Sequence, residues 1–362
     1  MATKAMKNII AAVVSGLFLT AHPVFAQSSA TSSTANASKS NASAPGAKST
    51  KQAKATNKSN AQAPKKQKTS VKKQDAQSAA KRKNFARSEP GYNSMGTRLG
   101  LRSQLSEISL NSSAVMVVDQ ETGRVLLDKN ADVALPIASI TKVMTALVVM
   151  DAELPLKEII TITKEDTQLE KYSSSRLRVG SKFTRAELLH LALMSSENRA
   201  AHALGRTYPG GMDAFVKAMN EKADDLGMTN SNFVEPTGLS SNNMSTPRDL
   251  SRLVNAAYEV PIIREYSTTT DAIVRVGGQQ QQFRNTNALT RNDNWEIGLS
   301  KTGFIRDAGK CLVMQATIDH QDVIIVMLDA QGSASRLSDA ERIRRWLSAD
   351  KDRQVAASSA RS

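Results

Sequence analysis

Residues 136–150 read PIASITKVMTALVVM, and we expect the rest of the chain to pack around this segment. A helix that is apolar nearly all the way round is typical of a protein interior and not of a surface. Ser139 and Lys142 stand three residues apart in its first turn, so their side chains share one face of the helix. The segment therefore predicts a buried helix that carries a serine and a lysine within contact distance.

The pairing of Ser139 with Lys142 suggests a specific chemistry. A buried ammonium group is costly to keep charged, so we expect the pKa of Lys142 to fall until its amine can take a proton from the neighbouring hydroxyl. The hypothesis is an activated serine nucleophile. The spacing is weak evidence alone, because the chain has three other Ser-x-x-Lys matches: Ser70 to Lys73, Ser78 to Lys81 and Ser348 to Lys351.

The segments on either side of this helix predict the fold class. Apolar-rich runs at 113–119 and 124–128 indicate a β-hairpin, and 295–304, 310–319 and 323–329 indicate three consecutive strands. Helices are predicted at 185–194 with Thr184 and Glu187 as a capping box, and at 199–207, 212–226, 247–260 and 335–347. We therefore expect an α+β fold. An antiparallel sheet of about five strands is formed by the N- and C-terminal segments and flanked by helices, with an inserted helical lobe.

The N-terminal part of the chain differs in composition from the rest. Residues 1–26 are typical of a secretory signal peptide, with Lys4 and Lys7 before a short apolar run and Val24-Phe25-Ala26 as a cleavage site. Residues 27–95 are rich in Ser, Ala, Lys, Gln and Asn and predict a disordered basic low-complexity linker. We expect one domain at 96–349 and a disordered tail at 350–362. The single cysteine, Cys311, is predicted to be a buried structural thiol.

The net charge of +14 comes from outside the predicted domain. Residues 27–90 contain 14 lysines and arginines against two acidic residues, whereas residues 91–362 contain 32 basic and 32 acidic residues. Nucleic-acid binding needs a basic patch on a folded surface, which this distribution does not support. A basic secreted segment could instead adhere to anionic polymers of the cell envelope, or act as a solvated spacer.

Two further motifs accompany the Ser139 and Lys142 pair. Ser196-Glu197-Asn198 stands between two predicted helices, where the hydroxyl could relay a proton and the amide could hold an amine. Lys301-Thr302-Gly303 stands on a predicted strand, and with Phe304 it would present a cation, a hydroxyl and an open backbone edge to a peptide. The order and setting of the three motifs are hard to obtain by chance.

Ser-x-x-Lys, Ser-x-Asn and Lys-Thr-Gly together resemble the signature of the penicillin-binding proteins and serine β-lactamases. The resemblance extends over residues 110–347 and is closest to low-molecular-mass penicillin-binding proteins of the D-alanyl-D-alanine endopeptidase type. Further segments carry it: Ser174-Ser175-Arg176-Leu177, Pro236-Thr237-Gly238-Leu239 and Ala308-Gly309-Lys310-Cys311. The resemblance implies a fold similar to that of the β-lactamases and transpeptidases.

The resemblance also implies roles for individual residues. Ser139 would be the nucleophile, Lys142 the general base lying between Ser139, Ser196 and Asn198, and Ser196 with Lys301 the proton relay to the leaving amine. The substrate would be bound by Asn198, Lys301, Thr302 and Gly303, with the backbone N–H groups of Ser139 and Phe304 as the oxyanion hole. This chemistry needs no metal and no organic cofactor.

The implied function is hydrolysis of D-alanyl cross-links in peptidoglycan, in the periplasm, with β-lactam antibiotics as covalent inhibitors. No nucleic acid is expected as a partner, and no stable transmembrane segment after signal cleavage. Two alternatives remain open: a D-alanyl-D-alanine carboxypeptidase that trims pentapeptides, and a non-catalytic wall-binding protein. Leu239 replaces the asparagine that class A β-lactamases have four residues after their deacylating glutamate, here Glu235. The chain should therefore hydrolyse β-lactams poorly.

Overall fold

The computed structural model describes residues 93–169 and 175–359. The predicted signal peptide and nearly all of the predicted linker lie outside the described residues, as do Ser174 and residues 360–362. The strands are β1 (Ala114–Asp119), β2 (Val125–Lys129), β3 (Leu135–Pro136), β4 (Ile159–Thr161), β5 (Lys182–Thr184), β6 (Met244–Ser245), β7 (Asp271–Val276), β8 (Gln279–Arg284), β9 (Glu296–Ile305), β10 (Gly309–Ile318) and β11 (Gln321–Ala330).

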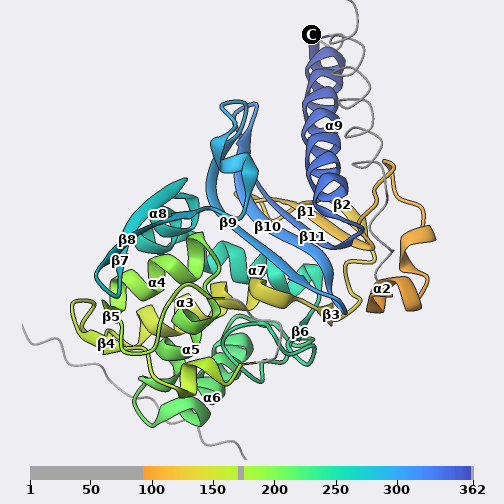
Figure 1. Ribbon diagram of the computed structural model, residues 1–362. Coiled ribbons are helices and arrows are strands. Elements are labelled where there is room, and N and C mark those ends of the chain that lie inside the picture. The colour runs from red at the N-terminus through yellow and green to blue at the C-terminus, as the bar shows by residue number, and fades with distance from the viewer. Residues whose placement is uncertain (1–92, 170–174, 360–362) are drawn as a thin grey trace, which may run out of the picture. The chain divides into compact units, whose positions relative to one another are not determined.

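Helices occupy most of the middle of the chain (Figure 1). The α-helices are α2 (Met95–Arg98), α3 (Thr141–Asp151), α4 (Arg185–Met194), α5 (Asn198–Arg206), α6 (Gly211–Asp225), α7 (Pro247–Tyr258), α8 (Pro261–Thr268) and α9 (Ser333–Ser359). Four 3₁₀-helices join them: η1 (Leu101–Ser103), η2 (Ala138–Ile140), η3 (Glu165–Thr167) and η4 (Ala288–Arg291). Within the described residues, no helix combines the length and the hydrophobicity that crossing a membrane requires.

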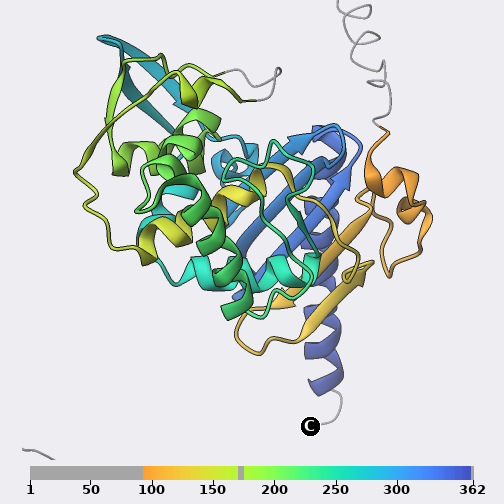
Figure 2. The ribbon, with the colours of Figure 1, turned by 90° about the horizontal axis from the view of Figure 1, so that it is seen from below.

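The predicted antiparallel sheet is confirmed. Its strand order is β2-β1-β11-β10-β9, so the first two and the last three long segments of the domain meet in one sheet. Every residue of β1 is buried, because both faces of the sheet are covered. Val115, Leu312 and Ile325 pack with the C-terminal helix α9, whereas Val313 and Ile324 face the helices on the other side. Figure 2 shows α9 and the helical lobe on opposite faces of the sheet.

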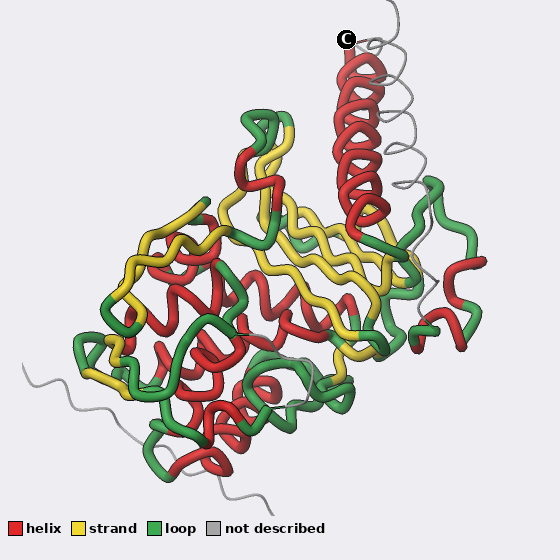
Figure 3. The backbone as a smooth tube through the Cα atoms, viewed as in Figure 1, coloured by secondary structure: helices red, strands yellow, loops and turns green. Residues whose placement is uncertain are grey.

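The predicted buried helix is also confirmed. All residues from Thr141 to Val149 in α3 are buried, and they form the centre of the largest hydrophobic cluster. The α-helix itself begins at Thr141, and Ser139 lies in the 3₁₀ turn η2 that precedes it. Helix α4 starts with the predicted capping box between Thr184 and Glu187. Figure 3 shows these helices gathered on one side of the sheet.

One prediction about the boundaries of elements is wrong. Helix α9 continues to Ser359 and does not end at Leu347, because no glycine or proline interrupts residues 348–359. At the other end of the described domain, Ser94 is buried and the Met95 N–H donates to the carbonyl of Asp307. Helix α8 and the β7–β8 hairpin were not predicted.

Candidate active site

Ser139 lies in η2 on a backbone that two other segments approach closely. Ala138, the preceding residue, has a left-handed conformation with φ of 49°. A Cβ atom on Gly303 of β9 would lie 2.8 Å from the carbonyl oxygen of Ile137, and one on Gly238 would lie 1.9 Å from that of Ala138. Only glycine permits such close packing of one backbone on another. The backbones at Gly303 and Gly238 thus pack against the two residues that precede Ser139 and fix the turn in which it lies. The Ser139 side chain itself is half-buried.

Lys142 lies beneath Ser139 and is fully buried. Its Nζ atom donates to Ser139 Oγ at 2.8 Å, to Asn198 Oδ1 at 2.7 Å and to the carbonyl oxygen of Thr237 at 2.6 Å. Burial lowers the pKa of Lys142 to about 7, against the opposing effect of the Glu235 and Glu197 charges. The predicted fall in this pKa is confirmed, and a large fraction of the amine is neutral near neutral pH.

Lys142 is hydrogen-bonded to Ser139 and Asn198, two of its three predicted neighbours, but no hydrogen bond joins it to Ser196, which the structure also describes. The Thr237 carbonyl occupies the third donor position of Lys142, and Ser196 Oγ instead accepts from Lys301 Nζ at 2.9 Å. Lys301 is buried and also donates to the carbonyl oxygen of Thr302. Burial, then the nearby charges of Lys142 and Arg336, lower the pKa of Lys301 well below its usual value. The site therefore contains two serine–lysine pairs, and Asn198, which accepts from Lys142, lies two residues after Ser196.

The predicted site residues border one groove of about 310 Å³. Six of the eight line it directly: Ser139, Ser196, Asn198, Thr302, Gly303 and Phe304. Lys142 and Lys301 lie directly behind the lining, hydrogen-bonded to Ser139 and Ser196. The structure thus brings all three motifs together from η2, the α4–α5 turn and β9. The geometry is that of a nucleophile with an adjacent base, which is the arrangement of covalent catalysis.

Four further residues of the groove were missed by the sequence analysis: Thr286, Lys310, Ser333 and Arg336. Thr302 Oγ1 donates to Thr286 Oγ1 at 2.6 Å, which holds the threonine of Lys-Thr-Gly at the groove wall. The Lys310 ammonium lies 3.6 Å from the centre of the Phe304 ring. Arg336 is buried, with Nη1 donating to the Cys311 carbonyl and no partner among the described residues for Nε. Arg336 is therefore the second cation among the residues that line the groove, after Lys310.

Arg336 had no recognisable sequence signal, because it occurs in an ordinary amphipathic run at the start of α9. Glu235 was noted only as a contrast with β-lactamases. Its carboxylate accepts from the N–H groups of Thr237 and Gly238 and from Asn243 Nδ2. Glu235 therefore shapes the loop that supplies the third partner of Lys142, and it is not among the residues that line the groove.

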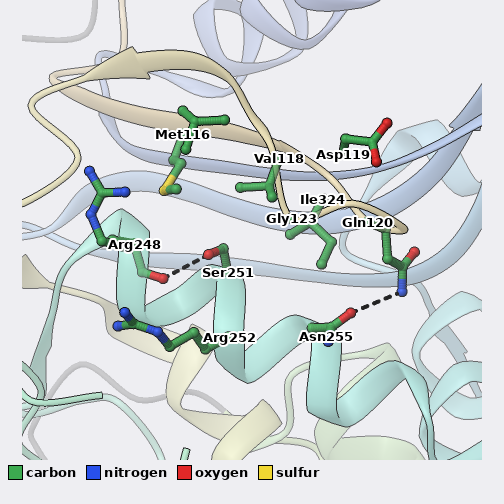
Figure 4. A pocket seen from close by; sticks show the side chains of 11 residues that line it. Met116, Val118, Asp119, Gln120, Gly123, Arg248, Ser251, Arg252, Asn255 and Ile324 are labelled. Atoms are coloured by element: carbon green, nitrogen blue, oxygen red, sulfur yellow. Dashed lines mark hydrogen bonds between the residues drawn. The ribbon is translucent and has the colours of Figure 1, made fainter. Parts of the chain in front are cut away.

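Other candidate groups lie away from the groove. Cys311 is buried, and burial raises the pKa of its thiol to about 12, which confirms a structural thiol. His202 Nδ1 lies 2.8 Å from Asp166 Oδ1, and neither residue lines the groove. A second hollow of about 270 Å³ lies between the β1–β2 hairpin and α7 (Figure 4). Its arginines, Arg248 and Arg252, are each paired with an aspartate, and it holds no serine–lysine pair.

The chain is similar to several characterised proteins. Residues 102–332 match the protein family described as D-alanyl-D-alanine carboxypeptidase. A D-alanyl-D-alanine endopeptidase of Pseudomonas aeruginosa is 52% identical over 240 residues, which are 66% of this chain and 77% of that protein. One of Escherichia coli is 46% identical over 248 residues, which are 68% of this chain and 80% of that protein.

Solved structures show the same likeness. The crystal structure of the Streptomyces K15 DD-transpeptidase superposes with a TM-score of 0.62 at 29% sequence identity. The match covers 67% of this chain and 98% of that one.

Proposed function

Because this chain belongs to the D-alanyl-D-alanine carboxypeptidase family of serine peptidases, we propose that it is a serine D,D-endopeptidase. Its substrates are D-alanyl cross-links in peptidoglycan, since the two relatives described above are named endopeptidases. One observation carries the proposal: the buried amine of Lys142 lies 2.8 Å from Ser139 Oγ at the floor of an open groove. A neutral amine at that distance can remove the serine proton.

Acylation follows from the two serine–lysine pairs. Ser139 Oγ attacks the carbonyl carbon of the D-alanyl residue while its proton passes to Lys142 Nζ. The C–N bond then breaks, and Ser196 delivers to the leaving amine a proton that Lys301 replaces. The product on the enzyme is an ester of Ser139, which water hydrolyses. Backbone N–H groups of Ser139 and Phe304 stabilise the oxyanion, and each such donor contributes about 3 kcal/mol in other enzymes.

Substrate recognition uses the edge of the sheet. β9 is the last strand in the described sheet order, so a peptide can lie beside it as an added strand. Lys310 and Arg336 give the groove two cations and Thr302 gives it a hydroxyl, which suit a carboxylate next to the scissile bond. Asn198 orients Lys142 and binds the substrate amide.

β-Lactams should acylate Ser139 and remain attached. The carboxylate of Glu235 is fully engaged by backbone and side-chain donors of its own loop, and so cannot activate a deacylating water in the groove. A fluorescent penicillin should therefore form a long-lived adduct with the wild-type protein and none with Ser139→Ala. Rapid turnover of the penicillin would contradict the assignment.

The deciding experiment compares two substrates. We expect the purified protein to convert cross-linked muropeptide dimers to monomers, and Ser139→Ala to leave them intact. Shortening of pentapeptide monomers without cleavage of dimers would establish the carboxypeptidase alternative instead. Binding to peptidoglycan with neither reaction would favour the non-catalytic alternative.

The site of action that we propose is the periplasm, on the strength of the signal-peptide pattern at residues 1–26. Mass spectrometry of the protein recovered from the periplasmic fraction should give a mature N-terminus at Gln27. Recovery of the full-length chain in the cytoplasmic fraction would refute this location.

A further inference from the structure

Glu197, the middle residue of Ser196-Glu197-Asn198, is a buried carboxylate that the mechanism above does not use. Its side chain is 5% exposed. Ser175 Oγ donates to Glu197 Oε2 at 2.5 Å, and Arg176 Nε lies 3.3 Å from Glu197 Oε1. A buried charge is unfavourable unless it is paired and hydrogen-bonded. The position of this one, between two residues of the groove, suggests that its bonds serve the site.

Arg176 connects Glu197 to a separate element. Its Nη1 donates to the carbonyl of Gln282 at 2.7 Å, and its guanidinium lies 3.7 Å from the centre of the Phe283 ring, both in β8. Two residues after the end of β8 comes Thr286, whose N–H donates to the carbonyl of Met194 at the end of α4. Arg176 therefore joins the α4–α5 turn to the strand that leads into the groove wall.

The α4–α5 turn needs such support. Ser196 has a left-handed backbone with φ of 61°, a conformation that is unfavourable for a non-glycine residue and persists only where the surroundings enforce it. The next residue, Glu197, is held by its N–H bond to Leu191 and by its side chain. Both neighbours of Glu197 contact a lysine of the site: Ser196 accepts from Lys301, and Asn198 accepts from Lys142. A shift of Glu197 would disturb both contacts.

We propose that Glu197 and Arg176 are positioning residues whose ion pair fixes the Ser196–Asn198 turn against β8 and so sets the contacts of both serine–lysine pairs. The inference rests on the proposed function in one respect, namely that Ser139 reacts with β-lactams. It assigns neither residue a contact with the substrate.

The ion pair also has an electrostatic consequence for Lys142. The charged groups that act on Lys142 are Glu235 from its loop and Glu197 from the start of α5, which raise its pKa, and Lys301 from β9, which opposes protonation. Removing the Glu197 charge should lower the pKa of Lys142. Removing Arg176 leaves the Glu197 charge without its cation and should raise the same pKa. The two halves of the pair should shift the pH profile in opposite directions.

The test measures the rate constant of acylation by a fluorescent penicillin as a function of pH in Glu197→Gln, Arg176→Met, Arg176→Lys and the Gln/Met double variant. Matched controls are Glu165→Gln and Arg178→Met, which change exposed residues of the same lobe outside the groove. We expect each single variant to lose on the order of tenfold in its plateau rate, because small displacements of catalytic groups reduce rates by up to about 10²-fold. The double variant should be no slower than the slower single variant.

The pH limb should move to lower pH in Glu197→Gln and to higher pH in Arg176→Met, with Arg176→Lys restoring part of the rate and both controls behaving as wild type. The proposal is overturned by wild-type rates in both single variants, by limbs that move in the same direction, or by rate losses that simply follow a lower melting temperature. A wild-type protein that forms no adduct would overturn the proposed function itself, and the positioning role with it.

Discussion

The pKa of Lys142 is set by the balance between desolvation and favourable interactions of its ammonium group. Complete burial disfavours the ammonium form, while three oxygen atoms within 2.8 Å and two nearby glutamates favour it. The result is a pKa of about 7, low enough for a base and high enough for the protonated amine to return its proton. A base is most effective when its pKa lies near the working pH.

This balance predicts the pH dependence of acylation. Only neutral Lys142 can accept the Ser139 proton, so the acylation rate should fall about tenfold per pH unit below the pKa of about 7 and level off above it. Stopped-flow measurement with a fluorescent penicillin, in buffers of constant ionic strength, would record the limb. A rate that stays constant from well below to well above pH 7 would contradict the role of Lys142 as the base.

Gly238 provides a second residue-scale prediction. Gly238→Ala would place a Cβ atom 1.9 Å from the Ala138 carbonyl oxygen and 2.8 Å from the Ser139 nitrogen, at a φ of 80°. We expect a loss of about 2–4 kcal/mol in the free energy of unfolding, and a large drop in acylation because the Ser139 turn must move. Chemical denaturation and penicillin labelling measure the two effects.

Gly227→Ala is the matched control for Gly238→Ala. Gly227 also has a left-handed backbone, with φ of 67°, but open space surrounds its missing Cβ atom. Gly227→Ala should lose only about 1–2 kcal/mol in the free energy of unfolding, which is the cost of a left-handed backbone at a non-glycine residue. Its acylation by penicillin should match that of the wild-type protein. Equal losses in the two variants would show that backbone strain, and not contact with the Ser139 turn, is the main effect at Gly238.

Residue patterns predicted which side chains meet at the groove better than they predicted the contacts between them. Ser139 and Lys142 could be recognised because helical spacing puts them on one face, whatever the rest of the fold does. The hydrogen bond from Lys301 to Ser196 joins the two residues expected to form the relay, whereas the Thr237 carbonyl as a partner of Lys142 could not be recognised, because it depends on the path of a loop distant in sequence. Arg336 is distant in sequence from all three motifs and reaches the groove only through the packing of α9.

At the scale of elements, α9 combines two functions. Its first turns supply Ser333 and Arg336 to the groove, and Leu347 is its last member of the cluster beneath the sheet. We expect a chain that ends after Ala349 to lose less than about 1 kcal/mol of stability and to acylate normally. A chain that ends after Ile343 also lacks Leu347 and should lose about 2–5 kcal/mol, the usual range for removing a buried leucine.

Thermal unfolding and penicillin labelling of the two truncated proteins would test this division of α9. If the protein that ends after Ala349 unfolds at a much lower temperature than the full-length protein, residues 350–362 contribute to stability in a way that the hydrophobic cluster does not reveal. Equal stability of both truncated proteins would show that Leu347 contributes little.

Elements with a strong local signal were predictable, and those that depend on tertiary contacts were not. The capping box of Thr184 and the apolar-rich strands β9 to β11 carry their own patterns. The β7–β8 hairpin has a Gly277-Gly278 turn, but its second strand contains four consecutive glutamines and lacks a continuous apolar face. Gln282 and Phe283 of this hairpin contact Arg176, which lies about a hundred positions earlier in the chain, so local sequence could not predict these contacts.

At the scale of the whole molecule, charge and fold are segregated along the chain. The domain that contains the groove belongs to the stretch 91–362, in which 32 basic residues balance 32 acidic ones, whereas residues 27–90 carry 14 basic residues against two acidic ones. A balanced domain has no long-range attraction to an anionic polymer, while a basic segment has. Composition alone made this division predictable, because net charge does not depend on the fold.

The last prediction concerns that segment. A protein that lacks residues 27–90 should acylate with penicillin at the wild-type rate but should no longer co-sediment with purified, anionic cell-wall sacculi. A variant with all 14 basic residues of the segment changed to glutamine keeps the length and should also fail to co-sediment. Binding of the wild-type protein should weaken with added salt, since the screening length falls from about 10 Å at 0.1 M to about 3 Å at 1 M. Retention of wall binding by both variants would assign it to the folded domain, and loss by the deletion alone would assign it to chain length and not to charge.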